Sequence, residues 1–104
     1  MSAFRVVFVT VPKDKAEELS HEIIDTRLAA CVNITGGVHS IYRWKGKIVK
    51  DEEALLIIKT ATKKVESLIK FVKEKHSYDV PEVISLNIAE GNPDYLDWID
   101  EETK

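Results

Sequence analysis

Cysteine, glycine and proline are scarce in this sequence. Its 104 residues contain 1 Cys, 4 Gly and 3 Pro. A single cysteine cannot close an internal disulfide, so the fold requires no oxidising compartment. No stretch rich in glycine, proline or serine separates two compositions, and a chain of this length has room for one domain. We therefore expect a single domain over residues 1–104.

Long hydrophobic runs are also missing. The most apolar run near the N-terminus is Val6–Val9, which follows Arg5 and is closed by Pro12. A membrane-spanning helix needs roughly 20 apolar residues, and a secretion signal needs a longer apolar centre with a small-residue cleavage site. The sequence predicts no direct membrane insertion and no secretion, and we expect a cytoplasmic protein.

An excess of basic residues is absent too. Lys and Arg number 15 against 18 Asp and Glu, which gives a formal net charge of -3. Proteins that bind phosphate backbones carry a basic stripe and a high pI, so we expect no nucleic-acid partner. The sequence has no Gly-rich phosphate loop, nucleophile elbow, Cys-x-x-Cys or His-x-x-x-His motif. Without a base–nucleophile pair, it predicts a protein that is not an enzyme.

Hydrophobic periodicity predicts four strands and three helices. Strands are indicated where β-branched and aromatic residues concentrate, and helices where apolar residues recur at three- and four-residue spacing. The order is β-α-β-β-α-β followed by a helix, which is typical of the α+β ferredoxin-like sandwich. In that fold two helices cover one face of a single antiparallel sheet. The predicted strands are 4–11, 31–44, 47–60 and 82–89, and the predicted helices lie near 16–28, 65–76 and 93–99.

The second and third predicted strands form an extended hairpin, joined by the two-residue link Lys45-Gly46. About 14 residues at roughly 3.3 Å each extend about 46 Å, whereas a domain of this size has a radius of gyration of about 13 Å. An overhanging hairpin exposes backbone edges and apolar side chains. We therefore expect it to pair with neighbouring subunits, which would also cover the open face of the sheet. The alternative is that Gly36-Gly37 breaks the first of these strands and leaves an ordinary hairpin.

Two residues are candidate metal ligands. Cys31 lies at a helix-to-strand junction, where a thiol is either a small buried hydrophobic residue or a soft ligand favoured by Cu(I). His76 ends the second long helix, where an imidazole is either a cation suited to the helix dipole or a metal ligand. In the second case Asp79 or Glu82 would supply an oxygen donor or orient the ring. Of the two candidates, His76 is the better.

Aromatic and basic residues surround the hairpin turn. Tyr42 and Trp44 are either anchors of a subunit interface or the lining of a cleft for a small anionic ligand. In the second case Lys59 or Lys47 would reach the anion. The nearby run Asp51-Glu52-Glu53 is expected to form a solvated turn or bulge, because adjacent carboxylates on a strand alternate faces and repel.

Five runs of the sequence together resemble the divalent-cation-tolerance (CutA) family. They follow one another in register and cover nearly the whole chain, which makes the resemblance specific. It implies a ferredoxin-like homotrimer, similar to the PII signalling proteins, in which long hairpins pair between subunits and clefts form between them. It also implies tolerance to copper and other divalent cations, with no established reaction. The runs are 27–33 (RLAACVN), 40–48 (SIYRWKGKI), 58–60 (IKT), 76–84 (HSYDVPEVI) and 95–98 (YLDW).

The resemblance is carried over to metal ligands position by position. Where copper ligands are assigned in bacterial relatives, they are a cysteine on the first strand and a His-His pair before the tyrosine-containing run. This sequence has Val9 at the first position and Lys75-His76 at the pair. Only His76 is kept, so the resemblance implies weak rather than tight copper binding.

The sequence leaves three functions open. The first is a homotrimer that binds copper or another divalent metal ion weakly through His76. The second is a PII-like regulatory module that binds a small anion or nucleotide in the inter-subunit cleft. The third is a trimeric scaffold with no ligand, whose aromatic residues only build the interface. The candidates for the cleft or interface are Tyr42, Trp44, Lys59, Tyr78 and Glu82.

Overall fold

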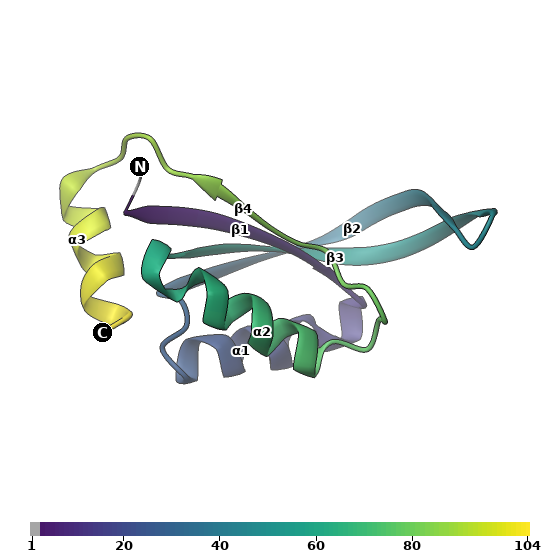
Figure 1. The fold of residues 1–104 in the computed structure, drawn as a ribbon, viewed down its shortest axis with the longest axis horizontal. Helices are drawn as coiled ribbons and strands as arrows, with labels where there is room; N and C mark the ends of the chain where they lie inside the picture. The colour runs from purple at the N-terminus through teal and green to yellow at the C-terminus, as the bar shows by residue number, and fades with distance from the viewer. Residues whose placement is uncertain (1–2) are drawn as a thin grey trace.

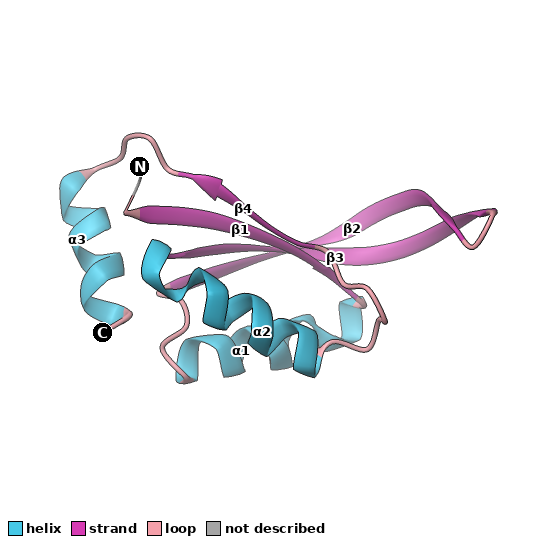
Figure 2. Ribbon diagram, in the orientation of Figure 1, coloured by secondary structure: helices cyan, strands magenta, loops and turns pink. Residues whose placement is uncertain are grey.

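The chain forms a four-stranded antiparallel sheet with two helices packed against one of its faces (Figure 1, Figure 2). The computed structural model describes residues 3–104. The strands lie in the order β2-β3-β1-β4, with β1 in the interior, as the ferredoxin-like prediction requires. The elements are β1 (Phe4–Val11), α1 (Ala16–Asp25), β2 (Cys31–Trp44), β3 (Lys47–Ala61), α2 (Val65–Lys75), β4 (Val83–Asn87) and α3 (Pro93–Glu102), with short 3-10 turns at Lys13–Lys15 and Thr62–Lys64.

The hydrophobic core lies between the sheet and the helices α1 and α2. Side chains alternate across a strand, and Val7, Val9 and Val11 of β1 are accordingly buried against the helices. The helices contribute apolar residues at three- and four-residue spacing, which places them on one face. The period of the sequence therefore decides which face of each element is buried. The buried partners from β3, α1 and α2 are Ala54, Leu56, Ile58, Ala16, Leu19, Ile23, Leu68 and Val72.

The terminal helix α3 begins where the sequence predicts. The side-chain Oδ1 of Asn92 accepts a hydrogen bond from the backbone N–H of Asp94 at 3.1 Å. Pro93 occupies the first turn, where its missing N–H is not needed. The helix lies at the end of the sheet opposite the hairpin turn (Figure 1). Within residues 3–104, no helix combines the length and the apolar character that crossing a membrane requires.

The β2–β3 hairpin extends well past the helices (Figure 2). The molecule measures 44 Å along its longest axis and 26 and 23 Å across, so the predicted overhang is confirmed. At the turn, Lys45 and Gly46 have φ of 50° and 79°, the left-handed pair that a two-residue hairpin turn needs. Strand β2 runs from Cys31 to Trp44 through Gly36-Gly37 without ending. The alternative of a strand broken at these glycines is therefore wrong.

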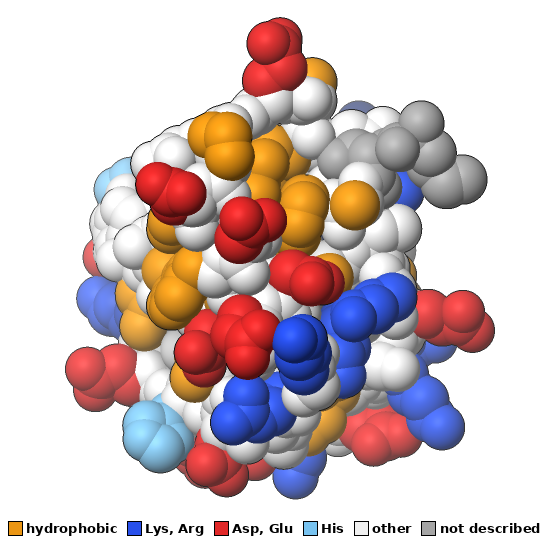
Figure 3. Space-filling view, turned by 90° about the vertical axis from the view of Figure 1, so that its left-hand side faces the viewer, with side chains coloured by type: hydrophobic (Ala, Val, Ile, Leu, Met, Phe, Trp, Pro, Cys, Tyr) orange, Lys and Arg blue, Asp and Glu red, His pale blue; other side chains and the backbone are white. Residues whose placement is uncertain are grey.

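Within residues 3–104, α1 and α2 leave the opposite face of the sheet uncovered (Figure 1). Ile84 and Leu86 of β4 lie on this face, paired with Phe8 and Val6 of β1, and each is about half exposed. Trp98 of α3 is also exposed. Figure 3, which views the end of the molecule that carries α3, shows hydrophobic side chains between groups of acidic and basic ones. Exposed apolar side chains of this kind are suited to contact with another chain.

Candidate functional site

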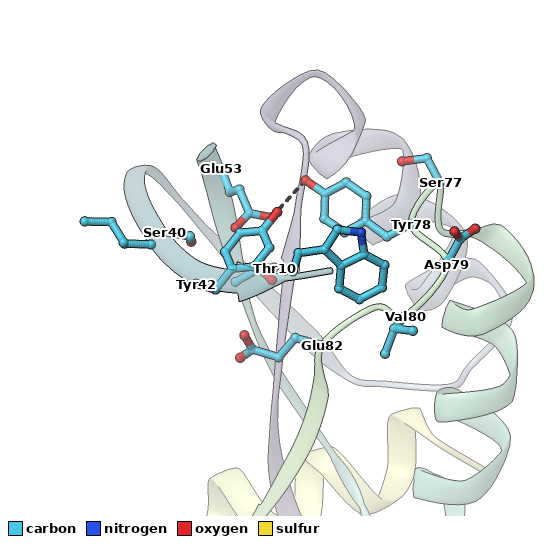
Figure 4. A pocket seen from close by; sticks show the side chains of 11 residues that line it. Thr10, Ser40, Tyr42, Glu53, Ser77, Tyr78, Asp79, Val80 and Glu82 are labelled. Atoms are coloured by element: carbon cyan, nitrogen blue, oxygen red, sulfur yellow. Dashed lines mark hydrogen bonds between the residues drawn. The ribbon is translucent and has the colours of Figure 1, made fainter. Parts of the chain in front are cut away.

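A cavity of about 640 Å³ lies between the β2–β3 hairpin and the segment that follows α2 (Figure 4). The hairpin provides aromatic and acidic side chains, and residues 77–82 provide the opposite wall. In Figure 4 the side chains of Tyr42, Glu53 and Tyr78 converge. The cavity is lined by Thr10, Ser40, Ile41, Tyr42, Trp44, Glu53, Ser77, Tyr78, Asp79, Val80 and Glu82.

A β-bulge places the two aromatic residues of the hairpin in this cavity. Between the pairs Thr35↔Leu55 and Val38↔Glu53, β2 has two residues, Gly36 and Gly37, and β3 has only one. One extra residue shifts the register and moves all later side chains of that strand to the other face. The bulge therefore brings Tyr42 and Trp44 to the face on which Glu53 lies.

The bulge depends on a left-handed backbone at one of its two glycines. Gly37 has φ of +71°, whereas Gly36 has no such φ, and a Cβ at either position would meet no atom within 4 Å. Gly37→Ala is therefore expected to lower the free energy of unfolding by about 1–2 kcal/mol, through backbone strain alone. Gly36→Ala should change it by less than about 1 kcal/mol, in the stabilising direction. Chemical denaturation of the two variants checks this, and equal effects would contradict it.

Glu53 and Tyr78 join the two walls of the cavity. The Tyr78 hydroxyl donates a hydrogen bond of 2.9 Å to Oε2 of Glu53, which is only 4% exposed. Burial, and then this hydrogen bond to a carboxylate, raise the pKa of Tyr78. The contact holds residues 76–82 against the hairpin, although the two partners are 25 positions apart in the sequence.

Tyr42 interacts with a second carboxylate at the same site. Its hydroxyl donates to Oδ2 of Asp51, which lies two residues from Glu53 on the same face of β3. The hydrogen bond to Asp51 is the main cause of the raised pKa of Tyr42, and the negative charges of Asp51 and Glu53 add to it. Both phenols therefore lie in a negative electrostatic environment.

All three tyrosines of the chain have raised pKa values. Burial is the main cause for Tyr78 and Tyr95, and the hydrogen bond to Asp51 for Tyr42. A folded-state pKa above the ordinary 10.0 means that folding favours the protonated phenol. The protonated phenol therefore contributes its full stabilisation below the ordinary phenol pKa of 10.0. This stabilisation is lost as the pH rises through the higher pKa of the folded state.

We therefore expect the tyrosinate absorbance of the native protein to titrate above pH 10.0, while the free energy of unfolding falls as the pH increases further. The reference is the same protein unfolded in urea, which should titrate at the ordinary phenol pKa. Coincident native and unfolded titrations would contradict the prediction.

His76 positions Tyr78 through both of its ring nitrogens. Nδ1 accepts a hydrogen bond of 3.1 Å from the backbone N–H of Tyr78, so the neutral ring carries its proton on Nε2. Nε2 then donates to the carbonyl of Thr10 at 2.7 Å. The two rings also contact, with centroids 4.5 Å apart. His76 thus ties the end of α2 to β1 and lies behind the cavity, not in its lining.

The whole chain is similar to proteins of one family. Residues 5–102 match the family described as CutA1 divalent ion tolerance protein. The chain belongs to this family. It is 50% identical over 99 residues to the divalent-cation tolerance protein CutA of Thermus thermophilus, with 94% of this chain and 96% of that one covered. The crystal structure of CutA1 from Oryza sativa matches with a TM-score of 0.95 at 47% identity, covering 99% of this chain and 95% of that one.

The CutA relatives differ in length. The chain spans about half of the chloroplastic protein CutA 1 of Oryza sativa, 56% of whose length it covers at 50% identity. It spans nearly all of the Thermus protein. The family is one of non-enzymatic tolerance proteins, which agrees with the lack of catalytic motifs in the sequence. The resemblance drawn from the five sequence runs is confirmed.

Four of the five residues predicted for a cleft come together in this CutA chain. Tyr42, Trp44, Tyr78 and Glu82 all line the cavity. Lys59 does not, because it pairs with Cys31 across the β2–β3 ladder and its Nζ donates to Asn33. It lies six residues along β3 from Glu53, which corresponds to roughly 20 Å.

The two predicted metal ligands lie apart. Cys31 is at the start of β2, half-buried, where its thiol interacts with the Tyr95 hydroxyl. His76 is at the level of Thr10, and both of its nitrogens are engaged. Within residues 3–104, no group of three or more His, Cys, Asp or Glu side chains could hold a metal ion. The described residues of a single CutA protomer therefore do not form a closed metal site.

Sequence reasoning missed Glu53. The run Asp51-Glu52-Glu53 was expected to be a solvated turn or bulge, but it is part of β3. Glu52 does face solvent and pairs with Lys13 at 3.1 Å, whereas Glu53 points to the opposite face and is buried. The alternation of side chains along β3 could have identified Glu53, because Glu53 is two residues from Leu55 and therefore lies on the same face of the strand.

Proposed function

We propose that this CutA protein serves divalent-cation tolerance as a cytoplasmic homotrimer that binds copper or another divalent metal ion weakly. The observation that carries the trimer is the hairpin that extends beyond its own protomer. Beyond the helices, the outer edge of β2 has no neighbouring strand in the sheet order of residues 3–104. An unpaired strand edge next to an apolar sheet face favours pairing with another copy.

The hydrogen bonds of the His76 ring support weak rather than tight binding of a metal ion. A metal ion can bind the imidazole only if one of its two hydrogen bonds, to Thr10 or to Tyr78, is broken. That loss opposes binding. Because one protomer supplies no set of three donors, further ligands would come from neighbouring subunits, as a threefold assembly allows.

The test is titration of the assembled protein with Cu(II) and with Zn(II). Wild type is expected to bind weakly, and His76→Ala on the order of ten-fold more weakly. His21→Ala is the matched control, because His21 is exposed on α1 and should leave the affinity unchanged. Equal affinity in wild type and His76→Ala would remove His76 from the site. If neither protein bound metal, a trimeric scaffold with no ligand would be the better-supported function.

The regulatory alternative, a small anion held in the cleft, has less support. It requires a basic side chain beside the aromatic residues, but the residues that line the cavity include neither lysine nor arginine. Lys59, which was expected to provide the charge, is bonded to Asn33 instead. An anion in this cavity would face the carboxylates of Glu53, Asp79 and Glu82.

A further inference from the structure

The cavity has the charge of a cation site. Three of its lining residues are acidic, Glu53, Asp79 and Glu82, and a fourth carboxylate, Asp51, accepts a hydrogen bond from Tyr42. Asp79 and Glu82 are exposed, whereas Glu53 is only 4% exposed. A cation entering the cavity would therefore pass from exposed carboxylates to a buried one.

Within the described residues of the protomer, Glu53 is a buried carboxylate without a cationic partner. It belongs to none of the ion pairs formed among residues 3–104. One oxygen accepts from Tyr78, but no described side chain donates to Oε1, and Oε1 is not among the buried unpaired atoms. That oxygen is therefore accessible from the cavity. A buried charge is stable when it is paired, so this position favours a positively charged ligand.

Aromatic rings form the walls around this carboxylate. Tyr42 and Trp44 line the cavity from the hairpin and Tyr78 from the opposite side. The faces of such rings attract ammonium groups. Both tyrosine hydroxyls donate to carboxylates, which leaves the rings as the surfaces available to a ligand.

The size and lining of the cavity indicate an organic ligand. Its volume of about 640 Å³ falls within the range of small-molecule sites, roughly 300–1,000 Å³, and far exceeds the volume of a bare metal ion. Ile41 and Val80 add apolar surface to the aromatic walls. A hydrated inorganic cation gains nothing from such surface, whereas a carbon chain is stabilised by it.

We propose that this cavity binds an organic ammonium ion, a primary amine on a carbon chain of several atoms. The ammonium group donates to Oε1 of Glu53, and the chain lies along Tyr42, Trp44 and Tyr78. The site is distinct from metal binding through His76, whose ring nitrogens are turned to Thr10 and to the Tyr78 backbone.

The experiment is calorimetric titration of the protein, in its native assembly and with EDTA present, with pentylamine and with the neutral isostere pentanol. The charge-assisted hydrogen bond predicts that pentylamine binds on the order of ten-fold more tightly than pentanol. Glu53→Gln should remove that preference, because glutamine keeps the acceptor for Tyr78 but loses the charge. Glu52→Gln is the matched control, since the neighbouring residue points away from the cavity, and it should bind as wild type does.

A second variant covers the case in which Glu53→Gln does not fold, which thermal melts would reveal. Trp44→Leu removes one aromatic wall at the exposed end of the hairpin and should weaken pentylamine binding about three- to ten-fold, with pentanol less affected. The proposal is overturned if wild type does not bind pentylamine, or if pentanol binds equally well. It is also overturned if neither Glu53→Gln nor Trp44→Leu binds pentylamine less tightly than wild type.

Discussion

Replacing Leu56 by alanine is expected to lower the free energy of unfolding by about 2–5 kcal/mol. Leu56 is 0% exposed and lies on β3, which is hydrogen-bonded to β2 on one side and to β1 on the other. A strand held on both sides cannot move into the space left by the lost side chain. The loss of buried apolar surface therefore adds to the energy of the remaining cavity.

The measurement is chemical denaturation at one fixed protein concentration, because subunit association makes apparent stability depend on concentration. The control is Ile24→Ala on α1, where the side chain is partly exposed and the better helix propensity of alanine offsets part of the lost contact. We expect Ile24→Ala to change stability by less than about 1 kcal/mol. Equal losses in the two variants would contradict the placement of the core between sheet and helices.

Replacing Ile84 by glutamate is expected to convert the proposed homotrimer into monomers. Ile84 is on the face of the sheet opposite α1 and α2, beside Phe8, and is 49% exposed in the protomer. A carboxylate there is tolerated while the face is open to water. Burying it unpaired in an apolar interface between subunits would disfavour association by several kcal/mol, on the order of a thousand-fold or more in the association constant.

Sedimentation at micromolar concentration distinguishes the two states. Ile24→Glu is the matched control, because Ile24 belongs to α1, which packs on the face of the sheet opposite the one that carries Ile84. It should remain a trimer, and Ile84→Glu should keep the circular dichroism of a folded protein. A monomeric wild type, or a trimeric Ile84→Glu, would show that this face is not the subunit interface.

Much of the fold could be predicted because it depends on local patterns. The alternation of valines in β1, the helical spacing of Leu68 and Val72, and the Lys45-Gly46 turn each indicate an element from neighbouring residues. The length of the hairpin follows from counting residues in an extended chain. These features need no knowledge of what lies across the sheet.

The candidate site could be predicted only in part. The residue types were informative, since Tyr42, Trp44, Tyr78 and Glu82 do meet in one cavity. Their common location depends on contacts between distant segments, such as the hydrogen bond from Tyr78 to Glu53. For the same reason the charge of this cavity could not be predicted, since within the protomer Lys59 is not part of its lining and Glu53 is.

The sequence by itself determined the types and order of the elements, the buried faces of β1 and the two long helices, and the overhang of the hairpin, because each follows from periodicity or chain length. Only the tertiary structure decided that the second half of β2 turns its aromatic side chains toward Glu53. That orientation depends on the bulge at Gly36-Gly37. The position of a bulge is set by pairing with another strand, and one inserted residue reverses the alternation of every side chain that follows.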